Sequence, residues 1–242
     1  MNLHDSKFQK QPKVEQGYDD GFYEERIERS SSELSAFIKQ TYQLFAASLV
    51  AGAAGAYVGV GISHIISGSI FIISIAWIIG GVWGLNAVKH KAGINVIALF
   101  LFTFVGGIIL GPLLTHVIGM NGGAGLVAKA FISSSVLFGG LSLYAMNSKA
   151  DFSSWGKPLM IALLITIGIS LVNMFIFQSP IMHVVILGVM LMIFSALVLY
   201  DTQAIIRGEV ETPIDGAIML YLDFLNIFMI ILQFFGIAGG DD

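Results

Sequence analysis

The chain has 242 residues, of which 56% are hydrophobic and only 12% are charged. Soluble domains carry about 25% charged residues, so this composition predicts a polytopic membrane protein. The formal net charge of -4 is too small to indicate a nucleic-acid partner. The absence of cysteine excludes disulfides, thiolate metal sites and cysteine catalysis.

The first 35 residues are rich in acidic and basic side chains and offer few apolar positions for burial. They predict a flexible or surface-lying cytoplasmic tail, followed by a membrane domain over 36–242. We expect no cleavable signal peptide, because this region lacks an apolar core segment. Ser30 and Glu33 have the spacing of a capping box, which predicts that a helix starts near Ser31 and runs into the membrane.

Seven apolar stretches follow, and each is long enough to cross a bilayer as a helix. Short polar or glycine- and proline-containing breaks separate them. We place the spans at 42–66, 69–88, 93–116, 126–147, 158–177, from 181 up to a link that begins at 208, and at 216–237. The predicted fold class is therefore all-α, with seven transmembrane helices.

Small residues recur along the first three spans, at four-residue spacing in spans one and two. They are Ala47, Ala51, Gly55 and Gly59 in span one, Gly80 and Gly84 in span two, and Gly106, Gly107, Gly111 and Pro112 in span three. Small residues let helix backbones approach closely, so we expect these faces of spans one and two to pack on protein rather than lipid. Proline is tolerated in a span where neighbouring helices or water satisfy the freed carbonyl.

The basic residues predict the orientation of the chain in the membrane. If the N-terminus is cytoplasmic, Lys129 is the only one of the 12 Lys and Arg residues on the external side. Cytoplasmic loops carry the excess of Lys and Arg in membrane proteins. We therefore predict the cytoplasmic (inner) membrane of a bacterium, with the N-terminus inside and the C-terminus outside.

Two aspartates lie in segments that otherwise have the composition of lipid-embedded helix, Asp201 in span six and Asp223 in span seven. The midpoint between them is Thr212 in the link, so an antiparallel hairpin brings both acids to similar depth. An ionised carboxylate in hydrocarbon costs at least about 2.5 kcal/mol and usually faces the bundle interior or a wet cavity. A functional pair is the favoured interpretation. In the alternative, Asp201 is hydrated near the surface and merely caps its helix with Gln203.

Paired acids can share a proton, and a cation in reach can replace that proton. Oxygen ligands are those that Ca²⁺ prefers, which makes Asp201 and Asp223 candidate calcium ligands. Gln203, Asn226 and backbone carbonyls could supplement them, although the sequence does not define a complete calcium cage.

Three motifs in register along the chain carry a resemblance to a known family. They are Gly107-Ile-Ile-Leu-Gly111-Pro112-Leu-Leu, Leu199-Tyr200-Asp201-Thr-Gln203, and Leu220-Tyr-Leu-Asp223-Phe-Leu-Asn226-Ile-Phe. Together they resemble bacterial members of the Bax inhibitor-1 family, also called the TMBIM or lifeguard family, over nearly all seven spans. The resemblance implies a pH-sensitive calcium leak with Asp201 and Asp223 as its di-aspartyl sensor. It also implies that the seventh helix is surrounded by the other six.

The resemblance further implies a cationic latch. Some members hold the first aspartate with an arginine at the cytoplasmic end of helix two, a position that Lys89 occupies here. The lysine ammonium is a point charge, whereas the arginine guanidinium can make two hydrogen bonds to one carboxylate. The pairing with Asp201 would therefore be weaker here. Tyr200, Gln203 and Asn226 are expected to support the ion path. We expect no enzymatic activity and no cofactor, and we expect the bilayer, calcium or protons, and other membrane proteins as partners.

Two other functions are compatible with parts of this pattern. A non-transporting regulator could bind other membrane proteins, such as a membrane-anchored protease, and calcium flux in liposomes would distinguish it from a leak. An intramembrane aspartyl protease also uses two Asp residues on adjacent helices. Of the sequence pattern of these proteases, the Tyr-Asp part is present as Tyr200-Asp201. The second part is missing, since Asp223 follows Tyr221-Leu222 where the pattern has a glycine.

The predicted topology can be tested with a reporter fused after Ile237. We expect the reporter to score as external, because an odd number of spans follows a cytoplasmic N-terminus. A cytoplasmic signal at this position would overturn the predicted topology.

Overall fold

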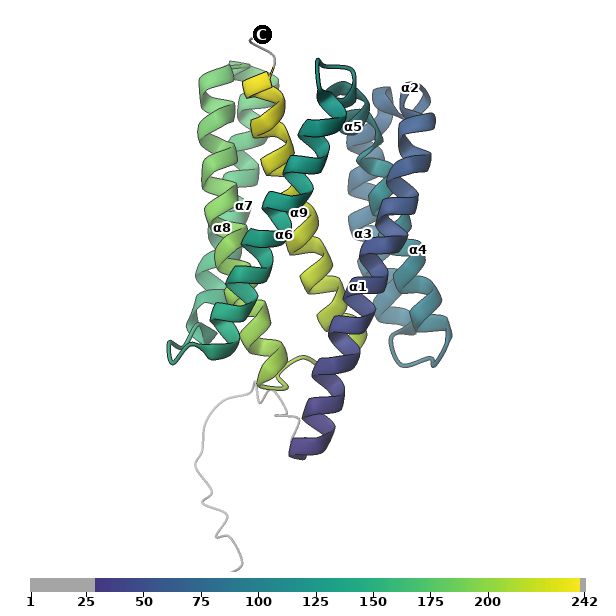
Figure 1. Cartoon of the computed structure of the whole chain (residues 1–242), viewed down its shortest axis with the longest axis vertical. Coiled ribbons are helices and arrows are strands. Elements are labelled where there is room, and N and C mark those ends of the chain that lie inside the picture. The colour runs from purple at the N-terminus through teal and green to yellow at the C-terminus, as the bar shows by residue number, and fades with distance from the viewer. Residues whose placement is uncertain (1–28, 240–242) are drawn as a thin grey trace, which may run out of the picture.

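A computed structural model describes residues 29–239, and the predicted tail over 1–28 lies outside this range. Every regular element in the described range is helical (Figure 1). The elements are α1 (Ser31–Gly61), α2 (Ser63–Ile66), η1 (Ser67–Ser69), α3 (Ile70–Val88), α4 (Ile94–Ile109), α5 (Gly111–Ile118), α6 (Gly123–Asn147), η2 (Ser153–Trp155), α7 (Gly156–Val172), η3 (Asn173–Phe177), α8 (Pro180–Ile206) and α9 (Pro213–Gly239).

The helices confirm the prediction of an all-α polytopic membrane protein. Six helical segments of the described chain are long and apolar enough to cross a membrane, and the pair α4 and α5 makes a seventh span that is bent by 41°. The bend lies beside Pro112, which has no backbone N–H to offer the carbonyl four residues earlier. Span one ends earlier than predicted, because α1 stops at Gly61 rather than near 66.

Capping boxes begin two of the spans. The Ser30 hydroxyl accepts from the Glu33 N–H at 3.3 Å and the Glu33 carboxylate accepts from the Ser30 N–H at 2.9 Å, which confirms the predicted start at Ser31. The tail predicted to reach 35 therefore overlaps α1. Thr212 and Asp215 form a similar box at α9, where the Thr212 hydroxyl donates to the Asp215 carboxylate at 2.7 Å. This unrecognised box explains why α9 begins before 216.

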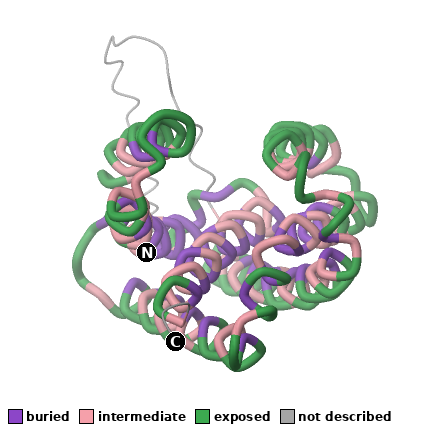
Figure 2. The backbone as a smooth tube through the Cα atoms, turned by 90° about the horizontal axis from the view of Figure 1, so that it is seen from above, coloured by how far each residue is buried: buried purple, intermediate pink, exposed green. Residues whose placement is uncertain are grey.

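Helix α9 occupies the middle of the bundle. It packs against α1, α4, α6 and α8, while α3 packs on α4 and α7 packs on α8. Half of its most apolar stretch (50%) is buried, a larger share than in any other candidate span. Seen from above, buried residues gather toward the centre and exposed residues cover the outer helices (Figure 2). Helix α9, which carries the motif with Asp223, is thus the helix that its neighbours enclose.

One end of the bundle carries nearly all the charge, and we call it the basic end. It contains the start of α1, the α3–α4 turn, the α6–α7 link and the α8–α9 loop (208–212), where Lys89, Lys149, Lys157 and Arg207 lie. The end of α9 lies at the opposite end of the bundle (Figure 1). We predict that the basic end is cytoplasmic.

Glycines bring α1 and α4–α5 into direct backbone contact. A Cβ atom added to Gly55 would lie 1.9 Å from the Phe104 carbonyl oxygen, and one added to Gly107 would lie 1.9 Å from the Gly52 carbonyl oxygen. Gly59 and Gly111 meet in the same way, with 2.2 Å from the Gly111 position to the Gly59 oxygen. No side chain fits at these four positions unless the two helices separate.

The packing expected for Gly80 and Gly84 of the second span is wrong. A Cβ atom added to either glycine would meet nothing within 4 Å, and both residues are exposed on α3. Their neighbour Gly81 makes the contact instead, because an added Cβ atom would lie 2.4 Å from the Phe102 ring. Gly80 and Gly84 therefore border an unfilled apolar space of about 310 Å³ between α3 and α4, and Gly81 makes the close contact there.

Alanine substitutions can test the close contact between α1 and α4. Gly107→Ala should lower the thermal midpoint in detergent by roughly 2 to 12 °C, because overpacking costs about 1 to 3 kcal/mol. Gly84→Ala is the matched control and should leave the midpoint unchanged or raise it slightly, since alanine favours helix over glycine. Equal midpoints for the two variants would contradict the assigned role of this contact.

Candidate functional site

Asp201 on α8 and Asp223 on α9 come together inside the bundle. Their exposed fractions are 8% and 4%, and their carboxyl groups are hydrogen-bond partners of one another. Two ionised carboxylates have only acceptor atoms, so a hydrogen bond between them requires a proton on one of them. The hairpin of α8 and α9 therefore produces the pairing that the equal spacing from Thr212 predicts.

The pair has no countercharge in this arrangement. Among the residues the structure describes, no Lys, Arg or His side chain forms an ion pair with either acid. One oxygen, Oδ2 of Asp223, is buried without a hydrogen-bond partner in this part of the chain. An unpaired buried oxygen of a carboxyl group is costly, which favours the protonated pair over two free charges.

A calcium cage around the two acids remains a prediction. Within residues 29–239 there is no group of three or more His, Asp or Glu side chains that could hold a metal ion. Two carboxyl groups fall short of the six to eight oxygen ligands that Ca²⁺ takes. Asp201 and Asp223 could thus contact a passing cation, with water or carbonyl oxygens completing its shell.

Hydroxyl groups from three helices lie beside the acid on α8. The hydroxyls of Ser142 on α6 and Thr202 on α8 are 3.0 Å apart, and Tyr42 of α1 lies next to both. The Tyr42 hydroxyl oxygen is buried against these two hydroxyls. Sequence reasoning missed this cluster, because isolated hydroxyl residues in apolar spans carry no motif.

Gln203 supports the site from outside the pair. Its amide oxygen accepts from the Phe152 N–H at 2.8 Å and from the Arg207 guanidinium at 3.0 Å, while its amide nitrogen donates to the Ala150 carbonyl at 2.8 Å. These bonds join the end of α8 to the α6–α7 link. Gln203 therefore positions α8, and its polar atoms are directed away from a role as calcium ligands.

Asn226 and Tyr200 also contact protein. The Asn226 amide donates to the Leu222 carbonyl of its own helix at 2.7 Å. The Tyr200 ring packs on Gly156 at the start of α7, where an added Cβ atom would lie 2.6 Å from the ring. Both residues flank the pair along the helices that carry it, as their spacing from Asp201 and Asp223 requires.

The expected pairing of Lys89 with Asp201 is wrong. The Lys89 ammonium pairs with Glu211 in the α8–α9 loop, and His90 Nε2 lies 2.9 Å from the other oxygen of that carboxylate. Lys89 follows the last residue of α3 at the basic end, whereas Asp201 lies six residues, or about 9 Å of helix, inside α8 from Arg207. Lys89 therefore pairs with Glu211, which lies at the same end of the bundle, and not with the more deeply placed Asp201.

Arg29 is a second anchor of the same loop, and sequence reasoning missed it. Its guanidinium donates to the carbonyls of Gly208, Val210 and Glu211 at 2.6, 3.0 and 2.7 Å, and it lies 4.1 Å from the centre of the Phe37 ring. The planar fork matches several carbonyls at once. Segments before α1 and after α3 thus hold the loop that joins the two acid-bearing helices.

The ion pairs at the basic end keep their charges near neutral pH. The Lys89 ammonium lowers the pKa of the Glu211 carboxyl, and Glu211 raises the pKa of Lys89. The Ser153 N–H and the Arg207 guanidinium, 2.7 Å away, lower the pKa of Asp151 to about 2. Because both carboxyl pKa values are depressed, both contacts are fully present above about pH 4, and the Asp151 contact is lost only as the pH falls toward about 2.

Fold and site together define a polytopic α-helical membrane protein with a buried acid pair on two adjacent spans. The family model described as "Inhibitor of apoptosis-promoting Bax1" matches residues 34–240. The chain belongs to this family, the Bax inhibitor-1 family, as its three motifs predict.

Bacterial relatives match most of the chain. An uncharacterised protein of Campylobacter jejuni is 49% identical over 206 residues, which cover 84% of this chain and 89% of the relative. An uncharacterised membrane protein of Vibrio cholerae is 33% identical over 87% of this chain and 93% of its own length. YccA of Escherichia coli, named a modulator of FtsH protease, is 30% identical over 66% of this chain and 74% of its own length.

The pairing of Lys89 with Glu211 can be tested with a double-mutant cycle on unfolding free energy. Lys89→Ala and Glu211→Gln remove the same contact, so the double variant should cost less than the sum of the single variants. Lys91→Ala is the control and should be additive with Glu211→Gln. Additivity of Lys89→Ala with Glu211→Gln, together with coupling to Asp201→Asn, would restore the original expectation.

Proposed function

We propose that this protein is a proton-controlled cation leak of the membrane, with calcium as its ion and the pair of Asp201 and Asp223 as its gate. The observation that carries the proposal is the hydrogen bond between two carboxyl groups on adjacent spans, buried and without a countercharge. Ionisable groups at such positions usually serve ions or protons, because their burial costs stability that a structural role does not need.

The proton that the pair shares acts as the link between α8 and α9. When it is present, the carboxyl groups attract each other and the two helices stay together. When it leaves, two like charges about 4 Å apart repel by about 4 kcal/mol at an effective dielectric constant of 20. That energy changes a population ratio by roughly a thousandfold, which is enough to move a helix between two positions.

The described arrangement fits a closed state of the leak. Beyond Asp223, α9 continues with Ile227, Ile230 and Leu232, each at most 6% exposed. A cation cannot pass a packed apolar layer without losing its hydration. Conduction therefore requires α9 to move, and the α8–α9 loop, which Arg29 and Lys89 hold, is the element that limits this motion.

Calcium flux into liposomes over about pH 5 to 8 tests the gate. The parent protein should change its flux with pH, and Asp201→Asn and Asp223→Asn should each lose most of this dependence, because an amide cannot give up the proton. The loss should be greater for Asp223→Asn, since Asp223 is the more buried acid. Lys89→Ala should raise the basal leak by loosening the loop.

Asp215→Asn is the matched control for these variants. Asp215 lies on the same helix, two turns before Asp223, and belongs to the capping box rather than to the pair. Its variant should keep the pH profile of the parent. The gate is refuted if all four proteins share one pH profile, and a parent without flux refutes the leak itself.

A second candidate function is regulation of a membrane-anchored protease. The observation that favours it is the 30% identity to the Escherichia coli protein named a modulator of FtsH protease. A second protein from that species is named an inner membrane protein, which suits a partner in the same membrane. In this alternative the bundle binds the protease or its membrane substrates and conducts no ion.

The two functions can be separated in Escherichia coli cells that lack their own relative. If the chain is a regulator, its expression should restore the normal lifetime of a membrane substrate of FtsH, measured after translation is stopped. Asp223→Asn should restore it equally well, because the pair has no part in binding. Restoration that needs both acids would instead connect the protease effect to the gate.

A further inference from the structure

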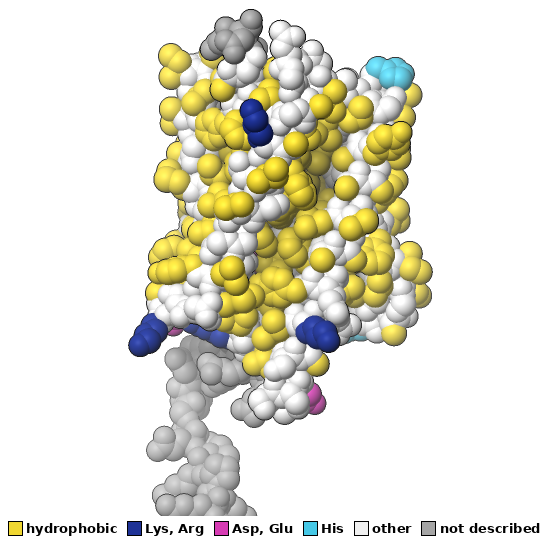
Figure 3. Space-filling view, viewed as in Figure 1, with side chains coloured by type: hydrophobic (Ala, Val, Ile, Leu, Met, Phe, Trp, Pro, Cys, Tyr) yellow, Lys and Arg dark blue, Asp and Glu magenta, His cyan; other side chains and the backbone are white. Residues whose placement is uncertain are grey.

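Few charged groups lie near the middle of α9. On the face seen in Figure 3, hydrophobic side chains cover the middle of the bundle and basic side chains lie toward its two ends. The helices packed on α9 carry the titratable residues Glu33, Lys39, Tyr42 and Tyr57 on α1, Lys129 and Tyr144 on α6, and His183, Tyr200 and Asp201 on α8, while the described helix α4 carries none. Packing and hydrogen bonds between helices fix their positions inside a bilayer. Hydrogen bonds are therefore the directional contacts that can fix the rotation of α9.

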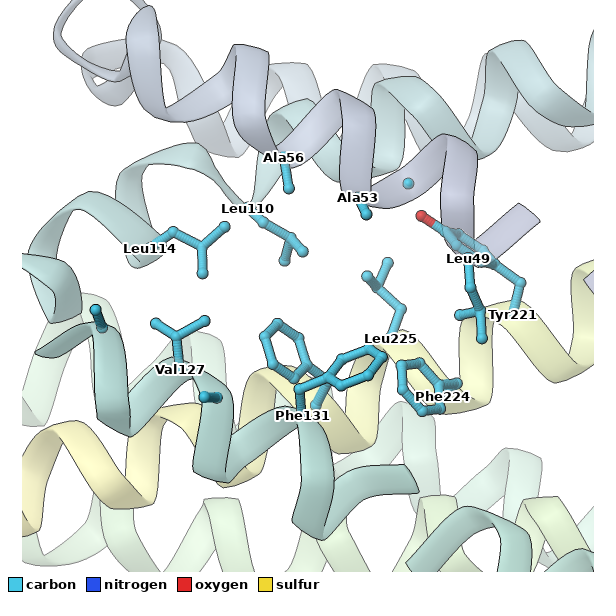
Figure 4. Close-up of a pocket in the computed structure, with 14 residues that line it drawn as sticks. Leu49, Ala53, Ala56, Leu110, Leu114, Val127, Phe131, Tyr221, Phe224 and Leu225 are labelled. Carbon is cyan, nitrogen blue, oxygen red and sulfur yellow. The ribbon is translucent and has the colours of Figure 1, made fainter. Parts of the chain in front are cut away.

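Tyr221 bonds α9 on the side that faces away from the acid pair. Its side chain is 1% exposed, and its hydroxyl donates to the Thr103 carbonyl of α4 at 2.8 Å. Figure 4 shows the ring leaving α9 toward α1, with its oxygen beside that helix. Asp223 follows two residues later, about 200° around the helix and about 3 Å along it. One turn of α9 is therefore bonded to α4 on one side and to α8 on the other.

Two glycines leave room for the Tyr221 hydroxyl. A Cβ atom added to Gly52 of α1 would lie 2.9 Å from this oxygen, and one added to Gly106 of α4 would lie 3.0 Å from it. The Thr103 carbonyl has two lone pairs, so it can accept from the phenol without giving up its place in the helix. A side chain at either glycine would push the hydroxyl away from this carbonyl.

Trp77 of α3 binds the neighbouring carbonyl of the same turn. Its indole N–H donates to the Phe102 carbonyl at 2.9 Å, and its ring stacks on the Phe102 ring with 4.6 Å between the centres. Gly106 lies against this ring as well, since an added Cβ atom would be 2.7 Å from it. The turn of α4 to which Tyr221 bonds is thus itself held in place from the side of α3.

We propose that Tyr221 is the positioning residue of the acid pair, because its hydrogen bond to the Thr103 carbonyl fixes the rotation of α9 that directs Asp223 at Asp201. The inference rests on the shared proton of the proposed gate and adds the contact that keeps the two acids aligned. A rotation of α9 that separates the acids also moves Tyr221 away from Thr103, so the two contacts form and break together. Contacts coupled in this way strengthen each other. The Tyr221 hydroxyl therefore helps the pair to retain its proton.

Infrared spectroscopy of the full chain in lipid vesicles tests this role. The C=O stretching band of the protonated pair is identified by its absence when Asp201 and Asp223 are both replaced by Asn, and it is followed over about pH 4 to 9. Tyr221→Phe keeps the ring and removes the donor, so the band should disappear at a lower pH than in the parent. The shift should be up to about 1 pH unit, which corresponds to the net contribution of one hydrogen bond.

Tyr57→Phe is the matched control for the hydroxyl. Tyr57 is 85% exposed on α1, so its variant should lose the band at the pH of the parent. Gly52→Ala displaces the Tyr221 hydroxyl without removing it and should shift the band in the same direction as Tyr221→Phe. Gly61→Ala on the same helix should not, because an added Cβ atom there meets nothing within 4 Å.

The positioning role is overturned if Tyr221→Phe and the parent lose the band at the same pH, even if the variant is less stable. A parent without a titrating band would overturn it as well. If Tyr221→Phe does not elute as the parent does in size-exclusion chromatography, the shift in Gly52→Ala decides. The infrared band is read without any ion flux. A parent that shows no calcium flux would therefore refute the leak, whereas a shifted band in Tyr221→Phe would still support the positioning role.

Discussion

Burial of two carboxyl groups between α8 and α9 is the constraint on which the rest of this structure depends. Asp201 and Asp223 are withdrawn from water and are hydrogen-bond partners of each other. Among the described residues, neither acid forms an ion pair with a basic side chain. A shared proton satisfies them, whereas two charges at this position would push the helices apart. The hairpin, its held loop and the packing around α9 all keep the two acids at one depth.

The scaffold around the pair has a rigid side and a softer side. On the rigid side, the glycine contact lets α1 and α4 touch through their backbones, and any separation would leave voids. On the softer side, an apolar cavity of about 390 Å³ between α1, α5 and α6 leaves one face of α9 without protein atoms over part of its length (Figure 4). A helix supported in this way can move toward the cavity more easily than toward α4.

The errors of the sequence-based predictions share one physical origin. Gly80 and Gly84 have the spacing of a packing face, yet α3 packs by the neighbouring Gly81 on Phe102. Lys89 was assigned to a buried acid, yet the exposed Glu211 in the adjacent loop reaches it first. Periodicity states which residues share a face of a helix, and charge states what a side chain could pair with. Neither property says which face of a helix packs on its neighbours, or which of the possible partners lies within reach of a charged side chain.

The sequence by itself determined the class of protein, the helical spans, the start of α1 and the identity of the acid pair. Each of these follows from local properties, namely hydropathy, capping chemistry and the equal distance of two acids from one loop. Only the tertiary structure decided that Arg29 and Lys89 hold that loop, through its carbonyl groups and Glu211. Such contacts join residues far apart in the chain, so they depend on how the helices pack against one another.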